Sequence, residues 1–496
     1  MDTKSKSTLK IKQPSPLYYL AFGELCERFS YYGTLTILAL YLSNVFQFVD
    51  DKSYSIYGVY ATFAFGIPIV GGILADRFLG LKKAIILGAL FLIMGNVLLA
   101  IPNFKIFSMG LALCVIGVGL YKPNSTILVG KLYSPNDPRR ESGFTIFYMA
   151  MNIGGMLGPI VYGLFIHSLG WHYGFYTSAV LTTFGIILFL SKIDVFTKNY
   201  VEIPKLNIQP LLAVKTKLLV YLSLIITTSI ITLTLYRPNL LSFLLIGFCI
   251  IVAGGLTIII RKYSLDERKR IIGLIILSSF AMFFFAASLQ VVSSISLFIN
   301  RDIDRSIFGW TIPTTMFSSL YPFAVILIAP FLTGIWSYLA LNKREPSIPT
   351  KLSLSLLLAS IGFICFSMAA ISSQNLLQSF YPIAWIVIGN LCLGTGELCL
   401  MPTIFSAISR FAPSNLQSTM IGVLFLFIAS AGYLSSLIAK ISNNSQVVTS
   451  KLMAHQLSVS IYNHTFIEIS IITFVFFVLF LLLTPWIKSL IKPQDS

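Results

Sequence analysis

Charged residues are scarce in this chain of 496 residues. Asp, Glu, Lys and Arg make up only 11% of it, whereas hydrophobic residues make up 56% and aromatic residues 14%. A soluble domain carries about 25% charged residues, and no soluble core in a chain of this length could hide so much apolar surface. The shortage of charge excludes a soluble globular protein and indicates a chain whose solvent is lipid, where aromatic rings anchor the ends of membrane spans.

Cysteine and histidine are also rare. The six cysteines all fall inside apolar stretches, with no disulfide framework and no spacing typical of a metal site. None of the four histidines lies in the middle of an apolar run, and two of them, His455 and His464, are expected near the last outer loop. No nucleophile–base pair is recognisable in any span. We therefore expect no enzyme, no catalytic residue, no metal and no cofactor.

The net charge of +17 does not indicate nucleic-acid binding, because the basic residues lie in short segments between apolar runs. In membrane proteins Lys and Arg accumulate in cytoplasmic loops and set the orientation. When the apolar runs are threaded through a bilayer, the basic segments fall on one side, and both termini fall on that side too. The sequence therefore predicts a multi-pass protein embedded in the lipid bilayer with both termini in the cytoplasm.

Fourteen stretches are long enough to cross about 30 Å of hydrocarbon, which takes roughly 20 helical residues. We therefore predict an all-α polytopic membrane protein with fourteen transmembrane helices. The expected spans are 17–44, 54–76, 83–101, 106–131, 141–168, 173–192, 215–236, 239–261, 271–300, 311–341, 350–372, 378–408, 416–440 and 463–489.

The spans group as six plus two plus six. The pair at 215–261 carries no intramembrane carboxylate and is flanked by basic segments, as expected of an inserted hairpin. Two parallel six-helix bundles are the general plan of the major facilitator transporters. The predicted parts are a cytoplasmic tail at 1–16, an N-terminal six-helix bundle at 17–192, a linker with the hairpin at 193–270, a C-terminal six-helix bundle at 271–489 and a cytoplasmic tail at 490–496.

The first span contains charges that are costly in a membrane. Glu24, Glu27, Arg28, Tyr31 and Tyr32 share one broad helical face, because Glu24–Arg28 and Glu27–Tyr31 are each four residues apart. Each ionised group at mid-membrane costs about 2.5–3.5 kcal/mol on insertion scales. A buried structural ion pair is one interpretation. However, the carboxylates outnumber the guanidinium, and low dielectric disfavours the charged form of the surplus carboxylate, which can then exchange a proton near neutral pH.

Two further charges lie inside later spans. Lys122 precedes Pro123 in the fourth span, where the loosened backbone fits a helix that lines a cavity. Glu397 is the acidic residue of the twelfth span. Snorkelling of Lys122 to the interface and a structural role for Glu397 are the alternatives. Cations on one half (Arg28 and Lys122) and an anion on the other indicate a site for a zwitterion.

A charged cluster follows the ninth span. Arg301, Asp302, Asp304 and Arg305 are expected to form a solvated loop on the outer side, with a gate as the alternative.

Several motifs, in order, resemble those of the proton-dependent oligopeptide transporters, the peptide branch of the major facilitators. Glu24-x-x-Glu27-Arg28-Phe-x-Tyr31-Tyr32-Gly33 resembles the first-helix signature of the family. The other matching segments are Gly72-x-Leu74-Ala75-Asp76-Arg77, Lys122-Pro123-Asn124, the stretch from Arg140 through Tyr148 and Asn152 to Gly154, and Gly396-Glu397-Leu398. The inserted hairpin is similar to that of the bacterial members, so the resemblance implies a bacterial cytoplasmic (inner) membrane.

The resemblance implies proton-driven uptake of di- and tripeptides by alternating access, with no cofactor. It implies that Arg28 and Lys122 meet the peptide carboxylate and that Glu397 and Asn152 meet its amino group. Glu24, Glu27 and Arg28 are implied as the proton-coupling group. The implied lining of the pocket is Tyr31, Tyr32, Phe65, Gln290 and Tyr321, and the implied conformational loop is Gly72, Asp76 and Arg77. A monomer is expected.

The chain departs from the family pattern at several positions. Leu35 stands where many members have a second arginine, and Leu289 or Gln290 stands where its acidic partner lies, so that link is absent at both ends. The other departures are Phe65 for a tyrosine, Tyr321 for an asparagine, Leu424 for a tryptophan and Met401 for a serine. The cargo is therefore expected to be di- or tripeptides or a narrower set of peptide-like zwitterions.

Two other functions fit the same fold. A proton-coupled antiporter exporting small organic compounds would favour an unbalanced acidic pocket, whereas this chain also has Arg28 and Lys122. A non-transporting receptor would have no need of charges that are costly to insert.

Overall fold

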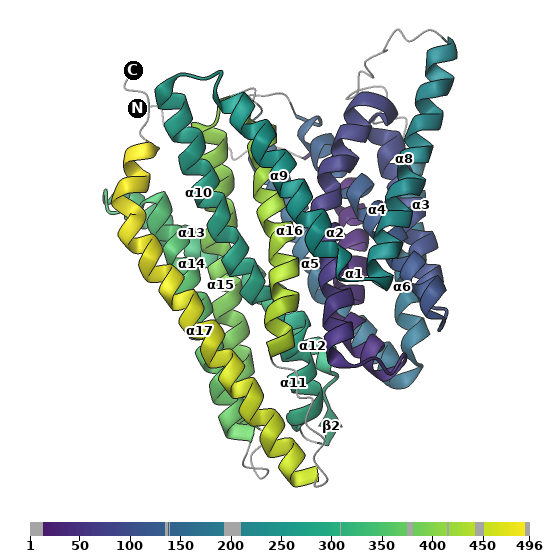
Figure 1. The fold of residues 1–496 in the computed structure, drawn as a ribbon, viewed down its shortest axis with the longest axis vertical. Helices are drawn as coiled ribbons and strands as arrows, with labels where there is room; N and C mark the ends of the chain where they lie inside the picture. Colours follow the sequence, from purple (N-terminus) through teal and green to yellow (C-terminus); the bar gives the residue numbers. More distant parts are fainter. Residues whose placement is uncertain are drawn as a thin grey trace, which may run out of the picture.

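A computed structural model describes residues 13–133, 137, 139–192, 210–307, 309–373, 380–413, 416–441 and 451–491. Most of the predicted terminal tails, 1–12 and 492–496, and the linker residues 193–209 lie outside the described residues. The described chain is almost entirely α-helical, which confirms the predicted fold class (Figure 1).

Six helices form the first body of the molecule, here called the N-half. Helix α1 packs on α5 and α6, α3 on α4 and α6, and α2 on α4. The bounds of these helices are α1 Ser15–Asn44, α2 Asp50–Leu74, α3 Leu81–Leu99, α4 Phe104–Gly130, α5 Arg140–Ser168 and α6 Trp171–Ser191, with the short π-helical turn η1 Ala75–Leu79 after α2.

The second body, here called the C-half, packs around α14, which contacts α15 and α17. The bounds are α10 Leu265–Ser288, η2 Leu289–Val292, α11 Ser294–Asp302, α12 Thr314–Ser318, α13 Leu320–Leu341, α14 Ile348–Ser373, α15 Phe380–Phe411, α16 Gln417–Ile441 and α17 Lys451–Leu490. A two-residue antiparallel pair, β1 Ser306–Ile307 and β2 Trp310–Thr311, lies between α11 and α12.

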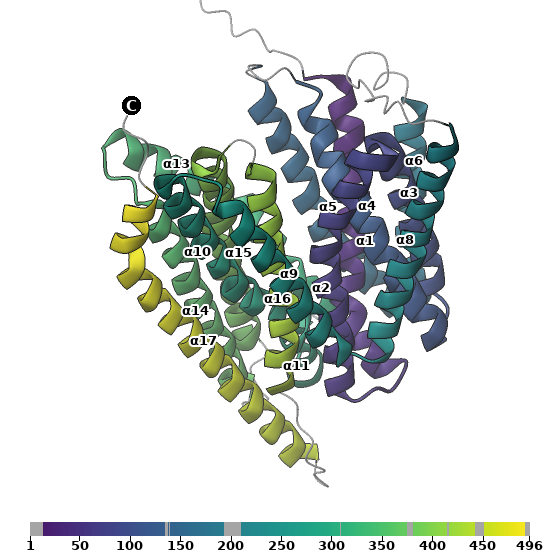
Figure 2. The same ribbon diagram turned by 45° about the horizontal axis from the view of Figure 1, so that its top comes forward.

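Two helices, α8 Pro210–Tyr236 and α9 Leu240–Ile260, stand between the bodies in sequence. Helix α8 packs on α4 and α2 of the N-half, whereas α9 contacts α16 of the C-half. We call this pair the hairpin. In Figures 1 and 2 it crosses the outside of the seam between the two halves.

Twelve stretches among the described residues are long and apolar enough to cross a membrane. The two other expected spans are helical as well. Helix α1 is less apolar because it contains Glu24, Glu27 and Arg28, and the apolar stretch described in α8, Val220–Tyr236, is shorter than the rest. The chain is therefore a polytopic membrane protein. Helix α1 begins and α17 ends at the same end of the molecule (Figure 2).

The ninth expected span, 271–300, is not one continuous helix. It starts earlier, at Leu265, where Ser264 and Glu267 form a reciprocal capping box. It breaks at the 3₁₀ turn η2, after which Ser293 has φ −125° and ψ −97° and α11 begins. Serines at 293 and 294 compensate for the break with side-chain hydrogen bonds, which a sequence reading for apolar length does not detect.

The last expected span, 463–489, is also longer than predicted. Helix α17 begins at Lys451. His455 therefore lies in this helix rather than in a loop, and its Nδ1 is 3.2 Å from Asp302 Oδ1. Ser458 donates a hydrogen bond of 2.8 Å to the other oxygen of Asp302. Asp302 is 7% exposed, so the prediction of a solvated loop is wrong for this residue.

Candidate functional site

The three charged side chains of α1 lie together in the interior. Glu24, Glu27 and Arg28 are 0%, 1% and 3% exposed. Both nitrogens of the Arg28 guanidinium edge bind Glu27: Nε donates to Oε2, and Nη2 donates to Oε1 at 2.6 Å. This two-point geometry is the strong form of an arginine–carboxylate pair. Glu27 and Arg28 therefore satisfy each other.

Glu24 is held differently. Its Oε1 lies 3.8 Å from Arg28 Nε and forms no hydrogen bond, while its Oε2 accepts a hydrogen bond of 2.7 Å from Ser125 of α4. Glu24 is thus the surplus carboxylate that the sequence predicted, bound at one oxygen only.

A glycine of α5 allows this group to be packed tightly. A Cβ at Gly154 would collide with the carbonyl oxygen of Leu25 and would lie 3.0 Å from the Cβ of Arg28. Because only glycine leaves this space, α5 can lie directly against the charged turn of α1. This explains the last residue of the fifth-helix motif.

Lys122 of α4 is half-buried and projects between the two halves. Its Nζ lies 5.9 Å from the ring centroid of Phe65 on α2 and 5.7 Å from that of Phe425 on α16. Both distances are within the range of cation–π attraction. Since Arg28 is engaged with Glu27, Lys122 is the cation of this site with partly accessible surface.

Glu397 of α15 brings the opposite charge from the C-half. It lies close enough to Lys122, Tyr32 and Tyr148 for electrostatic interaction with each of them. It also interacts with Tyr321 of α13, whose buried hydroxyl has no hydrogen-bond partner of good geometry. The structure therefore brings Lys122 and Glu397 together across the two halves.

Asn152 lies one helical turn from Tyr148 on α5. Its Nδ2 donates a hydrogen bond of 3.0 Å to the Tyr148 carbonyl, and its side chain also interacts with the Tyr148 hydroxyl. Tyr148 is 39% exposed. The amide of Asn152 thus orients the tyrosine that faces Glu397.

Aromatic rings surround the guanidinium of Arg28. The Tyr31 ring centroid is 4.9 Å and the Tyr32 centroid 5.9 Å from Arg28 Cζ. The Tyr31 ring contacts Phe65 edge-on at 6.2 Å and stacks with Tyr60 at 6.1 Å. Tyr31 is 2% exposed and packs behind Arg28 in the protein interior, whereas Tyr32 is half-buried.

Gln290, the other residue implied to line the pocket, contacts different partners from those of Tyr31 and Tyr32. It is 0% exposed and lies in η2, where its Nε2 donates to the carbonyl oxygen of Ser435 at 2.9 Å. Its Oε1 accepts a hydrogen bond of 2.6 Å from Ser294. Gln290 therefore fixes the break between α10 and α11 against α16.

The bonds that join the two halves gather at the end opposite the start of α1. Tyr57 of α2 donates a hydrogen bond of 3.0 Å to the Leu289 carbonyl in η2, and Ser319 donates one of 2.8 Å to the Met156 carbonyl of α5. We call this region the outer seal. Close helix contact adds to it, because a Cβ at Gly58 of α2 would meet Ser436 of α16.

An ion pair at the rim of the outer seal also joins the halves. Arg301 of α11 binds Asp50 of α2 with two bonds, Nη1–Oδ2 at 2.6 Å and Nη2–Oδ1 at 2.8 Å, and its Nη2 also donates to Ser43 at 3.2 Å. Arg301 is 38% exposed, as expected of a solvated residue, but it lies in α11 and not in a loop. Its link between the two halves agrees with the alternative of a gate.

The conformational loop motif lies at the other end of α2. Gly72 is in the last turn of α2, where a Cβ would be 3.9 Å from the Pro123 ring, an ordinary contact. The backbone of Asp76 and Arg77 follows in η1, but their side chains lie outside what the structure describes.

The sequence analysis assigned no role to three residues of this site. Ser125 directly follows the Lys-Pro-Asn motif, and Tyr148 lies one turn before Asn152, so spacing alone could have indicated both. Phe425 follows Leu424, the position at which a missing aromatic residue was noted, and the structure places its ring against Lys122. In the described parts of the chain, no cluster of three or more His, Cys, Asp or Glu side chains could hold a metal ion.

Known proteins are similar to this chain over most of its length. The model of the POT family matches residues 82–482. The uncharacterised transporter YclF of Bacillus subtilis is 31% identical over 445 residues, covering 86% of this chain and 87% of that protein. The peptide transporter YePEPT of Yersinia enterocolitica is 30% identical over 439 residues, covering 83% and 84%.

A solved structure shares the fold over nearly the whole length. It is a crystal structure of a mutant peptide transporter POT in complex with sulfate, with a TM-score of 0.82, 27% sequence identity, and coverage of 98% of this chain and 97% of that one.

Proposed function

This chain belongs to the POT family, and on that premise we propose that it imports di- and tripeptides, or peptide-like zwitterions, together with protons by alternating access. The chain is a transporter and not an enzyme. The observation that carries the substrate class is the placement of Lys122 on the N-half opposite Glu397 on the C-half, within electrostatic reach of each other. A zwitterion between them would neutralise both charges.

Lys122 is proposed to bind the substrate carboxylate first. Its position between Phe65 and Phe425 keeps its ammonium accessible, whereas Arg28 is occupied by both oxygens of Glu27. Arg28 would join the carboxylate site only in a state in which its pair with Glu27 is broken. Glu397 would receive the substrate ammonium, and Asn152 would support that end through Tyr148.

Glu24 is proposed to carry the transported proton. Its Oε1 has no hydrogen-bond partner, and its remaining contacts are a hydroxyl on Oε2 and the 3.8 Å approach of Arg28. Protonation of Glu24 therefore breaks fewer contacts than protonation of Glu27, which would break the bidentate pair with Arg28. The energy source would be the proton gradient, without a cofactor.

The outer seal is proposed to be the closed gate of the conformation seen here. With the basic loops in the cytoplasm, both termini are cytoplasmic, the seal faces outward and the site opens inward, as expected in a bacterial inner membrane. Because both charged halves of the site come from one chain, we expect a monomer to be sufficient for transport.

Uptake into proteoliposomes tests the proposal. Purified protein reconstituted in liposomes should accumulate labelled dialanine when the outside is acidic, and unlabelled di- and tripeptides should compete. A proton ionophore should abolish accumulation but leave exchange of internal for external peptide. If protons drive efflux of the compound instead, the chain is an antiporter; if no peptide competes or binds, the peptide assignment is wrong.

A further inference from the structure

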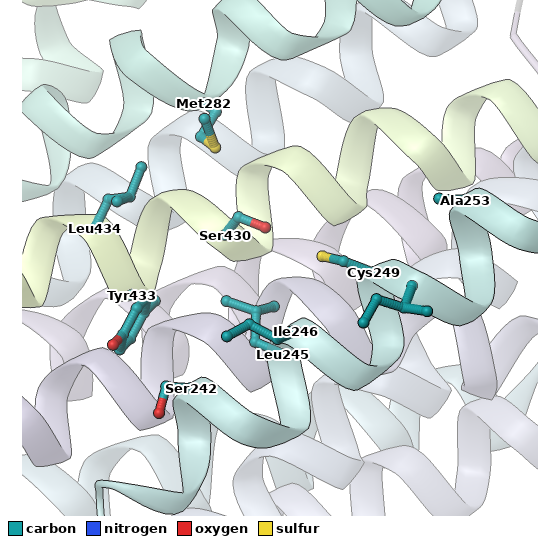
Figure 3. A pocket seen from close by; sticks show the side chains of 10 residues that line it. Ser242, Leu245, Ile246, Cys249, Ala253, Met282, Ser430, Tyr433 and Leu434 are labelled. Atoms are coloured by element: carbon teal, nitrogen blue, oxygen red, sulfur yellow. The ribbon is translucent and has the colours of Figure 1, made fainter.

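An apolar groove of about 460 Å³ lies away from the charged site, between α9 of the hairpin and the C-half helices α10 and α16 (Figure 3). Its walls include Leu245, Cys249 and Ala253 from α9, Met282 from α10, and Ser430 and Tyr433 from α16. Figure 3 shows Ser242 and Tyr433 at one end of the groove and Ala253 at the other. The groove is therefore elongated along α9, with Ser242 and Tyr433 at one end and Ser430 near its middle.

Helix α9 is hardly covered by protein. Phe243, Ile250 and Ile251 are 73%, 65% and 72% exposed. A Cβ built on Gly247 or Gly254 meets no atom within 4 Å. With a mean hydropathy of 2.8 in its most apolar window, α9 lies in hydrocarbon. The medium that reaches this groove is therefore the acyl chains of the bilayer.

The groove lies between the hairpin and the C-half. Helix α8 ties the hairpin to the N-half, where the Tyr236 ring contacts Phe104 of α4 at 5.1 Å. The opposite wall, α16, belongs to the C-half, and its other face enters the outer seal, where Gly432 packs against Thr62 of α2. An occupant of the groove would therefore contact α9, which α8 links to the N-half, and two helices of the C-half.

The end of the groove at Ser242 follows a basic residue in the chain. Arg237 is exposed in the turn directly before α9, and Ser242 follows in the first turns of that helix. The turn lies at the end of the outer seal, because Tyr236 contacts Phe104, over which Lys52 of α2 also lies at 5.4 Å. Aromatic rings and cations at one depth are typical of the interface where lipid headgroups reside.

We propose that this groove is a binding site for one acyl chain of a phospholipid in the outer leaflet, with the lipid phosphate bound at Arg237. The apolar walls exclude a polar ligand, the exposure of α9 gives access from the membrane, and the guanidinium supplies a partner suited to phosphate. The proposal concerns a surface remote from Lys122 and Glu397, and it holds whether or not the transported substrate is a peptide.

Photolabelling in nanodiscs tests the acyl-chain part. The probe is phosphatidylglycerol with a diazirine in its acyl chain, and adducts are mapped by mass spectrometry. We expect residues 240–253 and 430–434 to be labelled at least fivefold more than the exposed residues of α17. These are Phe474, Val475, Val478, Leu479, Leu481 and Leu482. Cys249→Trp, which fills the groove, should abolish the excess labelling of the groove over α17. Ile251→Trp adds the same ring to α9 at a residue outside the groove lining, and it should leave that excess labelling unchanged. Equal labelling of the groove and α17 would overturn the proposal.

Lipid retention tests the phosphate part without altering the groove. After mild delipidation, native mass spectrometry should show one phosphatidylglycerol retained by the wild-type protein and several-fold less by Arg237→Gln. Arg261→Gln, at the opposite end of α9, is the matched control and should retain lipid as the wild type does. Equal retention of phosphate-free diacylglycerol would show that the headgroup assignment is wrong.

Discussion

Glu24 and Glu27 share one face of α1 but differ in their partners. Glu27 uses both oxygens to bind Arg28, whereas Glu24 has one oxygen on Ser125 and one without a hydrogen bond. The sequence shows two carboxylates and one guanidinium, and it does not distinguish which carboxylate is surplus. The structure does, because Ser125 comes from a different helix.

Glu24→Gln is therefore expected to separate proton coupling from peptide binding. The amide keeps a hydrogen-bond acceptor for Ser125 but exchanges no proton. Proton-driven accumulation should fall at least tenfold, while exchange of internal for external peptide continues. Both rates can be measured in the same proteoliposomes with and without a pH gradient.

A second carboxylate serves as the control for that change. Glu468→Gln alters a 41% exposed residue of α17 and should leave accumulation unchanged. Full accumulation by a folded Glu24→Gln protein would contradict the proposed role of Glu24.

Lys122→Gln is expected to weaken substrate binding itself. A hydrogen bond to a charged group contributes about 1.5–3 kcal/mol, so the dissociation constant for a dipeptide should rise roughly tenfold to a hundredfold. Isothermal titration with dialanine measures this. An analogue without the carboxylate, such as dialanine amide, should bind the two proteins with more similar affinity.

Lys131 provides a matched comparison at the end of the same helix. It is exposed and forms the C-cap of α4, so Lys131→Gln should leave dipeptide affinity unchanged. An equal loss of affinity in both variants would show that the effect of Lys122 is not a contact with substrate.

Local spacing explains why part of this site could be predicted from the sequence. Glu24, Arg28 and Tyr31 lie on one helix, and their relation follows from helical geometry. Asp302 with His455, and Lys122 with Phe425, come from elements far apart in the chain. Their meeting depends on how helices pack, which one sequence does not determine.

At the scale of elements, apolar length predicted the helices well but not their interruptions. The break at Leu289–Val292 lies within a stretch that is long and apolar enough to be taken for one span. Side-chain hydrogen bonds from Ser293, Ser294 and Tyr57 stabilise it. The early start of α17 was missed because polar residues interrupt the apolar ones before 463, although this stretch is helical in the structure. Hydropathy reports contact with lipid, whereas helices extend beyond the bilayer.

The break at η2 also supplies the outer seal with an uncharged contact, the hydrogen bond from the Tyr57 hydroxyl to the Leu289 carbonyl. Tyr57→Phe removes the hydroxyl that binds the Leu289 carbonyl, a loss of about 0.5–1.5 kcal/mol. The ratio of outward-closed to outward-open molecules should therefore fall roughly threefold to tenfold. Electron–electron distance measurements between spin labels on the outer ends of α2 and α11 would show the added open population.

Tyr41 supplies the control for this experiment. Its hydroxyl is buried without a hydrogen-bond partner and its ring stacks on Phe107 at 4.9 Å. Tyr41→Phe should leave the distance distribution unchanged. If Tyr57→Phe also leaves it unchanged, the hydrogen bond to η2 does not help to hold the seal closed.

At the scale of the whole molecule, two helical bodies meet firmly at one end and are linked on the outside by the hairpin (Figure 1). Alternating access requires that this meeting be reversible, so no single contact in the outer seal can dominate it. The Asp50–Arg301 pair suits that requirement: its side chains are 12% and 38% exposed, and such pairs contribute about 0.2–1 kcal/mol.

Exchanging the charges of the Asp50–Arg301 pair tests whether this ion pair helps to hold the two halves together. Arg301→Asp places two carboxylates together, and the repulsion should shift the spin-label distances between α2 and α11 toward the open state. Adding Asp50→Arg should restore attraction and return the distance distribution toward that of the wild type. In 1 M salt the difference between the single and the double variant should be smaller, because salt screens both the repulsion and the attraction.

Exchanging Asp266 and Lys269, which pair within the first turns of α10, is the control and should leave the distance distribution unchanged. A double variant as open as Arg301→Asp alone would show that the pair does not close the gate, and the closure would then depend on the neutral contacts of Tyr57 and Ser319.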